Sequence, residues 1–207
     1  MNEKLVLHEY SPSGNCYKVR LTAALLGLPV ERREYDITRG ETRTERFLSE
    51  VNSNGRIPVL QVGGRFVPES NAACFFLADG SELIPKDRFE RADMLRWMFF
   101  EQYNHEPNIA TMRFWIAFVG EERLQEAQRA QMPSKRMAGD AALKLMDEEL
   151  AGRSFFVGDR LSLADIALYA YTHVAEEGGF DLSNYPNVGF WLERVAAAPG
   201  YVAIDAA

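Results

Sequence analysis

Hydrophobic residues in the first eighty positions follow two patterns in turn, one typical of strands and one typical of helices. Short alternating or apolar runs predict strands, and the two that flank Gly63-Gly64 should form a β-hairpin. Val19, Ala23 and Leu26 recur at helical spacing and predict a helix. In order, the predicted elements are a strand at 4–9, a helix at 14–28, a strand at 30–35, a helix at 42–51, strands at 57–62 and 65–67, and a helix at 69–78.

After a short linker at 80–86, every periodic segment of the chain is helical. Pro107 should stop or kink the first long helix, and a later long helical stretch should at most bend near Pro133. The predicted helices lie at 88–106, 108–120, 121–131, 133–152, 163–177 and 187–198. A βα half followed by an all-helical half predicts two domains, at 1–79 and 87–207.

The composition narrows the class of protein. The chain has 207 residues, of which 47% are hydrophobic and 26% are charged, as in ordinary globular proteins. Its formal charge of -7 disfavours nucleic acid and anionic membranes as partners. No apolar run approaches the ~20 residues that span a bilayer, and the N-terminus does not resemble a signal peptide. Two cysteines give no disulfide framework, so we expect a cytoplasmic protein.

Two short motifs in the first half carry candidate chemistry. Ile57-Pro58 follows a polar loop, and X-Pro bonds adopt the cis form at low cost. The simpler interpretation is that Pro58 only begins a strand. Glu69-Ser70 stands at the start of a predicted helix, where unpaired N–H groups and partial positive charge suit a carboxylate. Helix capping alone would also explain this pair.

These motifs together resemble the glutathione S-transferase family, and the resemblance runs along essentially the whole chain. It rests on the strand, Ser-rich turn and helix around 5–17, on Arg56-Ile57-Pro58-Val59, and on Glu69-Ser70 eleven residues after the proline. It implies an α/β thioredoxin-like N-terminal domain followed by an all-α helical domain. It also implies a homodimer that uses glutathione as co-substrate and needs no metal.

The resemblance assigns roles at the glutathione site. The backbone of Ile57, beside a cis Pro58, would pair with the cysteine of glutathione. Ser70 would hold the γ-glutamyl carboxylate, Glu69 would accept from the ammonium group, and Arg56 would lie near the glycyl end.

A serine is the expected activator of the thiol. A thiol with a pKa of about 8.5 needs stabilisation of its thiolate at neutral pH, and a hydroxyl at a helix N-terminus supplies it. Ser13 lies six residues before Val19, which resembles the pattern of theta-, phi- and tau-like transferases. Ser11, Tyr10 and Cys16 stay open as rivals. Cys16 has no Cys-x-x-Cys partner, so only a monothiol role is available to it.

The helical half offers weaker candidates. The resemblance implies that part of its first long helix forms an electrophile pocket, with Tyr103, Arg113 and Trp115 as candidate contacts. His105 is a further candidate, but it has no nearby Cys or second His for a metal site and is more simply a satisfied or surface histidine. Asp165 belongs to the pattern Ser-Leu-Ala-Asp, which is typical of a capping box, so we assign it to folding.

The resulting hypothesis is a glutathione transferase that conjugates the thiolate to a small hydrophobic electrophile. A glutathione-dependent peroxidase, isomerase or disulfide reductase would use the same thiolate. A binding or scaffold protein without catalysis is the alternative from another class.

Overall fold

The computed structural model describes residues 3–206, which divide into two compact units. The N-terminal unit holds the chain up to Ile84 together with the segment from Ala198 onward, and the helical unit is Pro85–Ala197. The boundary falls inside the predicted linker. None of the helices found in residues 3–206 is both long and apolar enough to span a bilayer.

A four-stranded mixed sheet forms the centre of the N-terminal unit. Its strands are β1 (Leu5–Glu9), β2 (Glu31–Glu34), β3 (Val59–Val62) and β4 (Arg65–Pro68), in the order β2-β1-β3-β4. β2 runs parallel to β1, and β3 and β4 are antiparallel to their neighbours. The predicted order of strands, the βαβ unit and the Gly-Gly hairpin are confirmed, and the topology is thioredoxin-like.

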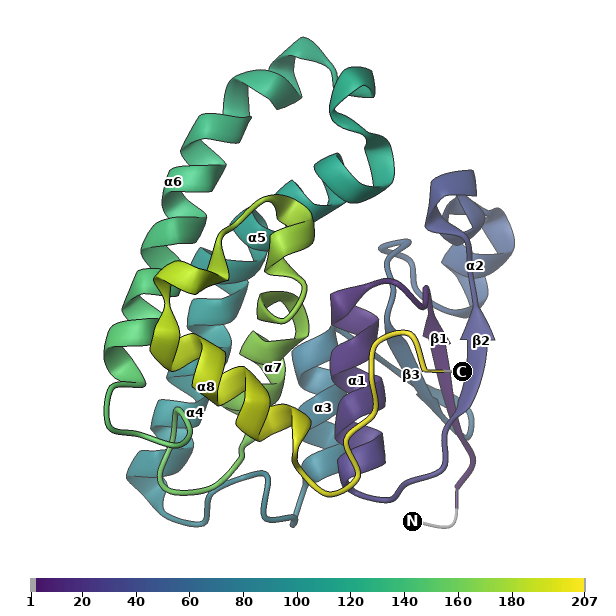
Figure 1. The fold of residues 1–207 in the computed structure, drawn as a ribbon. Coiled ribbons are helices and arrows are strands. Elements are labelled where there is room, and N and C mark those ends of the chain that lie inside the picture. The colour runs from purple at the N-terminus through teal and green to yellow at the C-terminus, as the bar shows by residue number, and fades with distance from the viewer. Residues whose placement is uncertain (1–2, 207) are drawn as a thin grey trace. The chain divides into compact units, whose positions relative to one another are not determined.

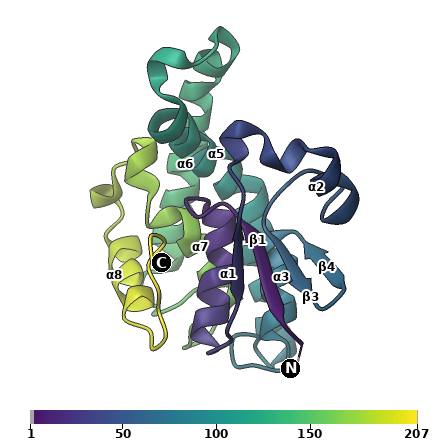
Figure 2. The ribbon, with the colours of Figure 1, turned by 90° about the vertical axis from the view of Figure 1, so that its right-hand side faces the viewer.

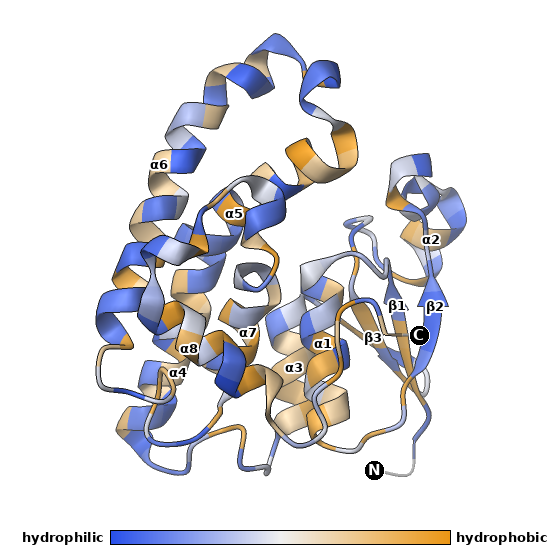
Figure 3. Ribbon diagram, in the orientation of Figure 1, coloured by the Kyte–Doolittle hydropathy of each residue, from blue (hydrophilic) through white to orange (hydrophobic). Residues whose placement is uncertain are grey.

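The helices of this unit place two N-termini at one end of the sheet. α1 (Gly14–Leu25) and α3 (Ser70–Ala78) lie together on one face, and α2 (Glu45–Glu50) lies beyond them near β2 (Figures 1 and 2). The edge strand β2 is entirely charged, and Figure 3 shows it as the hydrophilic strand of the sheet. Charged residues on an edge discourage pairing with other chains.

The central strand β1 is buried at all five positions, including the polar residues His8 and Glu9. An aliphatic core from α1 and β3 surrounds it, so a strand that reads as half-polar in the sequence lies in the interior. The largest buried aliphatic side chains of this core are Leu7, Leu21 and Leu60.

The last segment of the chain differs from the predicted domain of 87–207. From Ala198 onward the chain belongs to the N-terminal unit, where it runs beside α1 (Figure 1). The Tyr17 hydroxyl donates to the carbonyl of Val202 at 2.7 Å, and Nη1 of Arg32 donates to the carbonyl of Ala206 at 2.9 Å. These bonds are the physical reason for the difference, because they join residues more than 170 positions apart.

The helical unit contains α4 (Arg88–Phe100), α5 (Glu106–Arg113), α6 (Glu126–Glu149), α7 (Leu163–Thr172) and α8 (Pro186–Ala196). α7 is buried along its whole length and packs against α4, α5 and α8. It is therefore the central helix of this unit. Its sequence, an apolar run that follows a capping box, also indicates a buried helix.

Pro107 and Pro133 both lie within helical structure. Pro107 lies in the first turn of α5, and a π-helical turn at Glu101–His105 precedes it. A wider turn accommodates a residue that has no N–H to donate. Pro133 lies inside α6, so the long helical stretch expected here is one continuous helix from Glu126 to Glu149.

The capping box before α7 is confirmed. Oδ2 of Asp165 accepts from the Ser162 N–H and hydroxyl, each at 2.9 Å. Oδ1 accepts from the Phe156 N–H and from Nε1 of Trp191, each at 3.0 Å. Burial raises the pKa of the Asp165 carboxyl, and these four bonds act against that rise. Asp165 therefore joins three segments of the helical unit.

Candidate functional site

Two helix N-termini meet within the N-terminal unit. Ser13 is the N-cap of α1, where its Oγ accepts from the Cys16 N–H at 3.4 Å. α3 begins at Ser70, whose hydroxyl donates to Oδ1 of Asn15 at 3.2 Å. This bond brings the first turns of both helices together. Two sets of unpaired N–H groups and two partial positive charges then favour an anion at this place.

Glu69 and Ser70 have contrasting environments at the start of α3. Ser70 is buried, whereas Glu69 is exposed and makes no side-chain cap bond to the helix. Glu69 has φ 70° and ψ 118°, and among residues 3–206 it is the one non-glycine residue with positive φ. Such a conformation costs about 1–3 kcal/mol and is typical of functional sites. The placement of the pair at a helix N-terminus is confirmed.

The loop before β3 carries the predicted backbone contact. The Ile57-Pro58 bond is cis, as the resemblance implied, with Pro58 buried and Ile57 half-buried. Arg56 is exposed, and its carbonyl accepts from Nδ2 of Asn52 at 2.9 Å. The loop is thus held by its own polar residues and leaves the Arg56 side chain open to solvent.

Ser13 follows a tight turn at the end of β1. Its N–H donates to the Tyr10 carbonyl at 2.9 Å, and the side chain is half-buried. The Ser13 hydroxyl accepts from the Cys16 N–H, and its own proton faces the Cys16 thiol, which is a weak acceptor. It can therefore donate a hydrogen bond to a sulfur anion placed at the start of α1.

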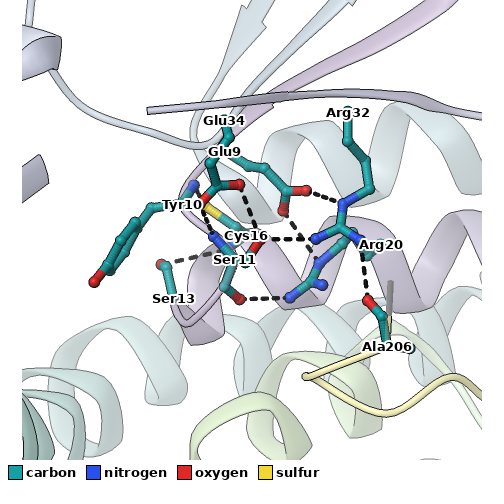
Figure 4. Close-up of polar contacts among 9 residues, drawn as sticks. All are labelled: Glu9, Tyr10, Ser11, Ser13, Cys16, Arg20, Arg32, Glu34 and Ala206. Atoms are coloured by element: carbon teal, nitrogen blue, oxygen red, sulfur yellow. Dashed lines mark hydrogen bonds and ion pairs between the residues drawn. The ribbon is translucent and has the colours of Figure 1, made fainter. Parts of the chain in front are cut away.

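Ser11, the nearest rival, has no proton to give. Its hydroxyl donates to Oε2 of Glu34 at 2.8 Å, and its N–H donates to Oε1 of the same carboxylate at 2.7 Å (Figure 4). Its Oγ also accepts from Nη2 of Arg32 at 2.8 Å. This serine is occupied by structural contacts.

Cys16, another rival, is disfavoured by its surroundings. It is fully buried, and burial raises the pKa of its thiol to about 12, although hydrogen bonds from Tyr10 and Ser13 act against that rise. A thiol of this kind is not a nucleophile at neutral pH. The Tyr10 phenol points away from the charged side chains around Ser11 (Figure 4), and Tyr10 stays an open rival of Ser13. Cys74 is buried in α3, as its apolar neighbours predicted.

The predicted electrophile contacts lie in three different environments of the helical unit. Tyr103 is 85% exposed, whereas Arg113 and Trp115 are buried. Nε of Arg113 donates to Oε2 of Glu177 at 2.8 Å, so its charge is already paired. The role of these three side chains in binding an electrophile stays a prediction.

His105 is a buried histidine rather than a surface one, and its Nε2 is hydrogen-bonded to Thr172. The Thr172 hydroxyl donates its proton to the Leu168 carbonyl at 2.7 Å, so Nε2 of His105, 2.8 Å from the hydroxyl oxygen, must be the donor to it. Within the part of the chain that the structure describes, no group of three or more His, Cys, Asp or Glu residues is placed to hold a metal ion.

Sequence reasoning missed a group of charged side chains beside the Ser11 turn (Figure 4). Glu9 is fully buried and lies between Arg20 and Arg32, while Glu34 lies on the exposed side. The only signal in the sequence was a charged strand, Glu31–Glu34, beside the apolar one that ends in Glu9.

Comparison with known proteins identifies the family. A model of the glutathione S-transferase N-terminal domain matches residues 12–79, and a model of the C-terminal domain of that family matches residues 105–199. The crystal structure of a glutathione S-transferase from Pseudomonas fluorescens Pf-5 is similar, with a TM-score of 0.91, 46% identity, and coverage of 98% of this chain and 99% of that one.

Two further relatives agree. A glutathione S-transferase structure from Xanthobacter autotrophicus Py2 is 37% identical with a TM-score of 0.91, covering 98% of this chain and 97% of that one. Glutathione S-transferase 2 of Anopheles gambiae is 27% identical over 194 residues, which are 91% of this chain and 88% of the relative. The chain therefore belongs to the glutathione S-transferase family.

Proposed function

We propose that this enzyme conjugates glutathione to a small hydrophobic electrophile, and that Ser13 stabilises the glutathione thiolate. The observation that carries the proposal is the hydroxyl proton of Ser13. At the N-terminus of α1 this proton faces the Cys16 thiol, which is a weak acceptor, whereas the Ser11 proton is given to the Glu34 carboxylate. A hydrogen bond to the charged sulfur, together with the helix dipole, lowers the pKa of the thiol.

Glutathione binding follows from the remaining groups of the N-terminal unit. Ser70 and the N–H groups of α3 suit the γ-glutamyl carboxylate, and the exposed carboxylate of Glu69 suits the ammonium group beside it. Backbone groups of Ile57 pair with the cysteine of the ligand. The exposed Arg56 side chain supplies charge for the glycyl carboxylate.

The helical unit supplies the electrophile contacts in this proposal. Tyr103, Arg113 and Trp115 stay the predicted residues, and Tyr103 is the most accessible of them. Catalysis then consists of holding the two reactants together and stabilising the thiolate, which needs no acid or base on the electrophile. The homodimer and the cytoplasmic location stay expectations that rest on the family resemblance.

A peroxidase, isomerase or disulfide reductase would use the same thiolate, and a non-catalytic member would bind glutathione without activating it. The test is a difference titration near 240 nm, in which glutathione is added to the protein across a range of pH. A saturable thiolate signal at neutral pH that is lost in Ser13→Ala supports the proposal. Saturable binding with no thiolate signal would favour the non-catalytic alternative. Comparing the turnover of a generic electrophile with the turnover of a peroxide distinguishes a transferase from a peroxidase.

A further inference from the structure

The turn that carries Ser13 is held from two sides by charged side chains. Ser11 is the central point, and every polar group on it has a partner. Its N–H and hydroxyl both donate to Glu34, its Oγ accepts from Arg32, and its carbonyl accepts from Nη2 of Arg20 at 2.7 Å. These hydrogen bonds restrict the backbone and side-chain torsions of Ser11, and they therefore hold the turn in this conformation.

The two arginines are themselves anchored on one carboxylate. Nε of Arg32 donates to Oε1 of Glu9, and Nε of Arg20 lies 3.1 Å from Oε2 of Glu9. Glu9 is fully buried and Arg20 is 8% exposed. Burial raises the pKa of Glu9, and the two guanidinium groups act against that rise. We call Glu9, Arg20, Arg32 and Glu34 the Ser11 clamp.

A buried cluster of this kind needs an explanation other than stability. Removing charges from water costs several kcal/mol per ion, so apolar residues at the same positions would often be as stable or more so. What a buried cluster of ion pairs and hydrogen bonds provides is one defined geometry. Here that geometry is applied to Ser11, two residues before the hydroxyl that we assign to the thiolate. The N–H of Ser13 closes the same turn on the Tyr10 carbonyl.

Arg32 has the widest reach in the cluster. Its guanidinium joins Glu9, the Ser11 hydroxyl and, through Nη1, the carbonyl of Ala206 at 2.9 Å. Three acceptors in different directions require the planar fork of arginine, which the single ammonium group of lysine cannot replace. The last segment of the chain is therefore tied to the turn through this one side chain.

We propose that the Ser11 clamp positions Ser13, with Arg32 as its principal positioning residue. The clamp touches neither glutathione nor the electrophile and acts only through the turn. This inference rests on the proposed function, because it assigns a purpose to the clamp through the hydroxyl of Ser13.

The test compares Arg32→Lys with Arg33→Lys, its neighbour on the same strand. Arg33 is exposed, lies outside the clamp and undergoes the same chemical change. In Arg32→Lys we expect the pKa of bound glutathione to rise by about half a unit to one unit, which lowers kcat about three- to tenfold at pH 6.5. Near pH 9 the difference in kcat between Arg32→Lys and the unmodified protein should shrink. KM for glutathione should stay within about twofold, because the groups that bind the carboxylates and backbone of glutathione lie outside the clamp. Arg33→Lys should match the unmodified protein.

A second variant keeps the test open if Arg32→Lys folds poorly. Glu34→Ala changes an exposed residue and removes two bonds to Ser11, so it should shift the thiol pKa in the same direction by a smaller amount. A lower melting temperature with an unchanged thiol pKa in both folded variants would overturn the inference and reduce the clamp to a structural role.

Ser13→Ala, measured in parallel, separates the two failures. If Ser13→Ala loses the thiolate signal while both clamp variants keep it with an unchanged thiol pKa, the positioning inference fails and the proposed function stands. If Ser13→Ala keeps the signal, the assignment of Ser13 fails and the inference falls with it.

Discussion

Two helices of this protein begin with a serine cap, and the two serines differ in where their hydroxyl protons go. Ser162 is fully buried and gives its proton to Asp165, three residues further on. Ser13 is half-buried, and the residue three positions on is Cys16, whose thiol is a much weaker acceptor than a carboxylate. The same local motif thus closes a helix in one unit and leaves a donor in the other. The identity of the third residue of the helix decides which.

The largest effect should come from removing the Asp165 carboxylate, which accepts the proton of the capping Ser162. Asp165→Ala leaves four buried donors without their acceptor, so we expect the free energy of unfolding to fall by about 3–5 kcal/mol. Chemical denaturation monitored by circular dichroism measures it. Glutathione affinity of the folded fraction should not change, and a loss of less than about 1 kcal/mol would contradict the role of Asp165.

The paired variants Ser13→Ala and Ser162→Ala should give opposite results. Ser13→Ala should lower kcat about 100-fold at pH 7, because the thiolate loses one hydrogen-bond donor. The same change should lower the free energy of unfolding by only about 1 kcal/mol, through the loss of the helix cap. Ser162→Ala should cost about 2 kcal/mol of stability and leave kcat within about twofold. Steady-state kinetics and thermal melts on both proteins make the comparison, and equal kinetic effects would break it.

Acid should weaken the N-terminal unit through His8, which is fully buried in β1. Nε2 of His8 donates to Gln61 at 3.0 Å, so Nδ1 accepts from the Tyr35 hydroxyl at 2.9 Å, and the ring is neutral. Burial lowers the pKa of His8, so below pH 6.5 the unfolded state binds more protons than the folded state. Stability is then retained above pH 6.5 and lost as the pH falls, by at most about 1.4 kcal/mol per pH unit for this group.

Denaturation curves at pH 7.5, 6.5 and 5.5 measure that loss. His8→Gln removes the titrating ring and should show a shallower decline. His173 also has a lowered pKa caused by burial, so His173→Gln is the matched control from the helical unit. A slope that does not change in His8→Gln would assign the acid sensitivity elsewhere.

The smallest expected effect is at Cys16. With a pKa of about 12, less than about one thiol in ten thousand is ionised at pH 7.5, so the native protein should resist iodoacetamide at this position. Mass spectrometry of native and denatured samples measures the labelling. Cys16→Ala should leave the glutathione thiolate signal unchanged. Rapid native labelling would return Cys16 to the list of candidate nucleophiles.

Local patterns in the sequence were sufficient for most of the fold and for part of the site. The Gly63-Gly64 hairpin, the cap at Ser162 and the helix start at Ser70 each depend on residues within a few positions, and all three are confirmed. The family resemblance added the cis bond at Pro58. Neighbouring residues in the sequence are sufficient to specify these features.

The features that could not be predicted join distant residues. The burial of Glu9 depends on Arg20 and Arg32, which no periodicity connects to it. The hydrogen bond from the Ser11 hydroxyl to Glu34 joins residues 23 positions apart. Each of these is a tertiary contact, for which a single sequence carries no direct signal.

The return of the chain to the N-terminal unit at Ala198 changes how this protein can be recombined with its relatives. The helical unit is topologically an insertion, with one junction at Ile84–Pro85 and a second at Ala197–Ala198. A chimera made with a single crossover at the first junction would import foreign partners for Tyr17 and Arg32. A chimera with crossovers at both junctions would keep them, so exchange of substrate preference between family members should use two splice points.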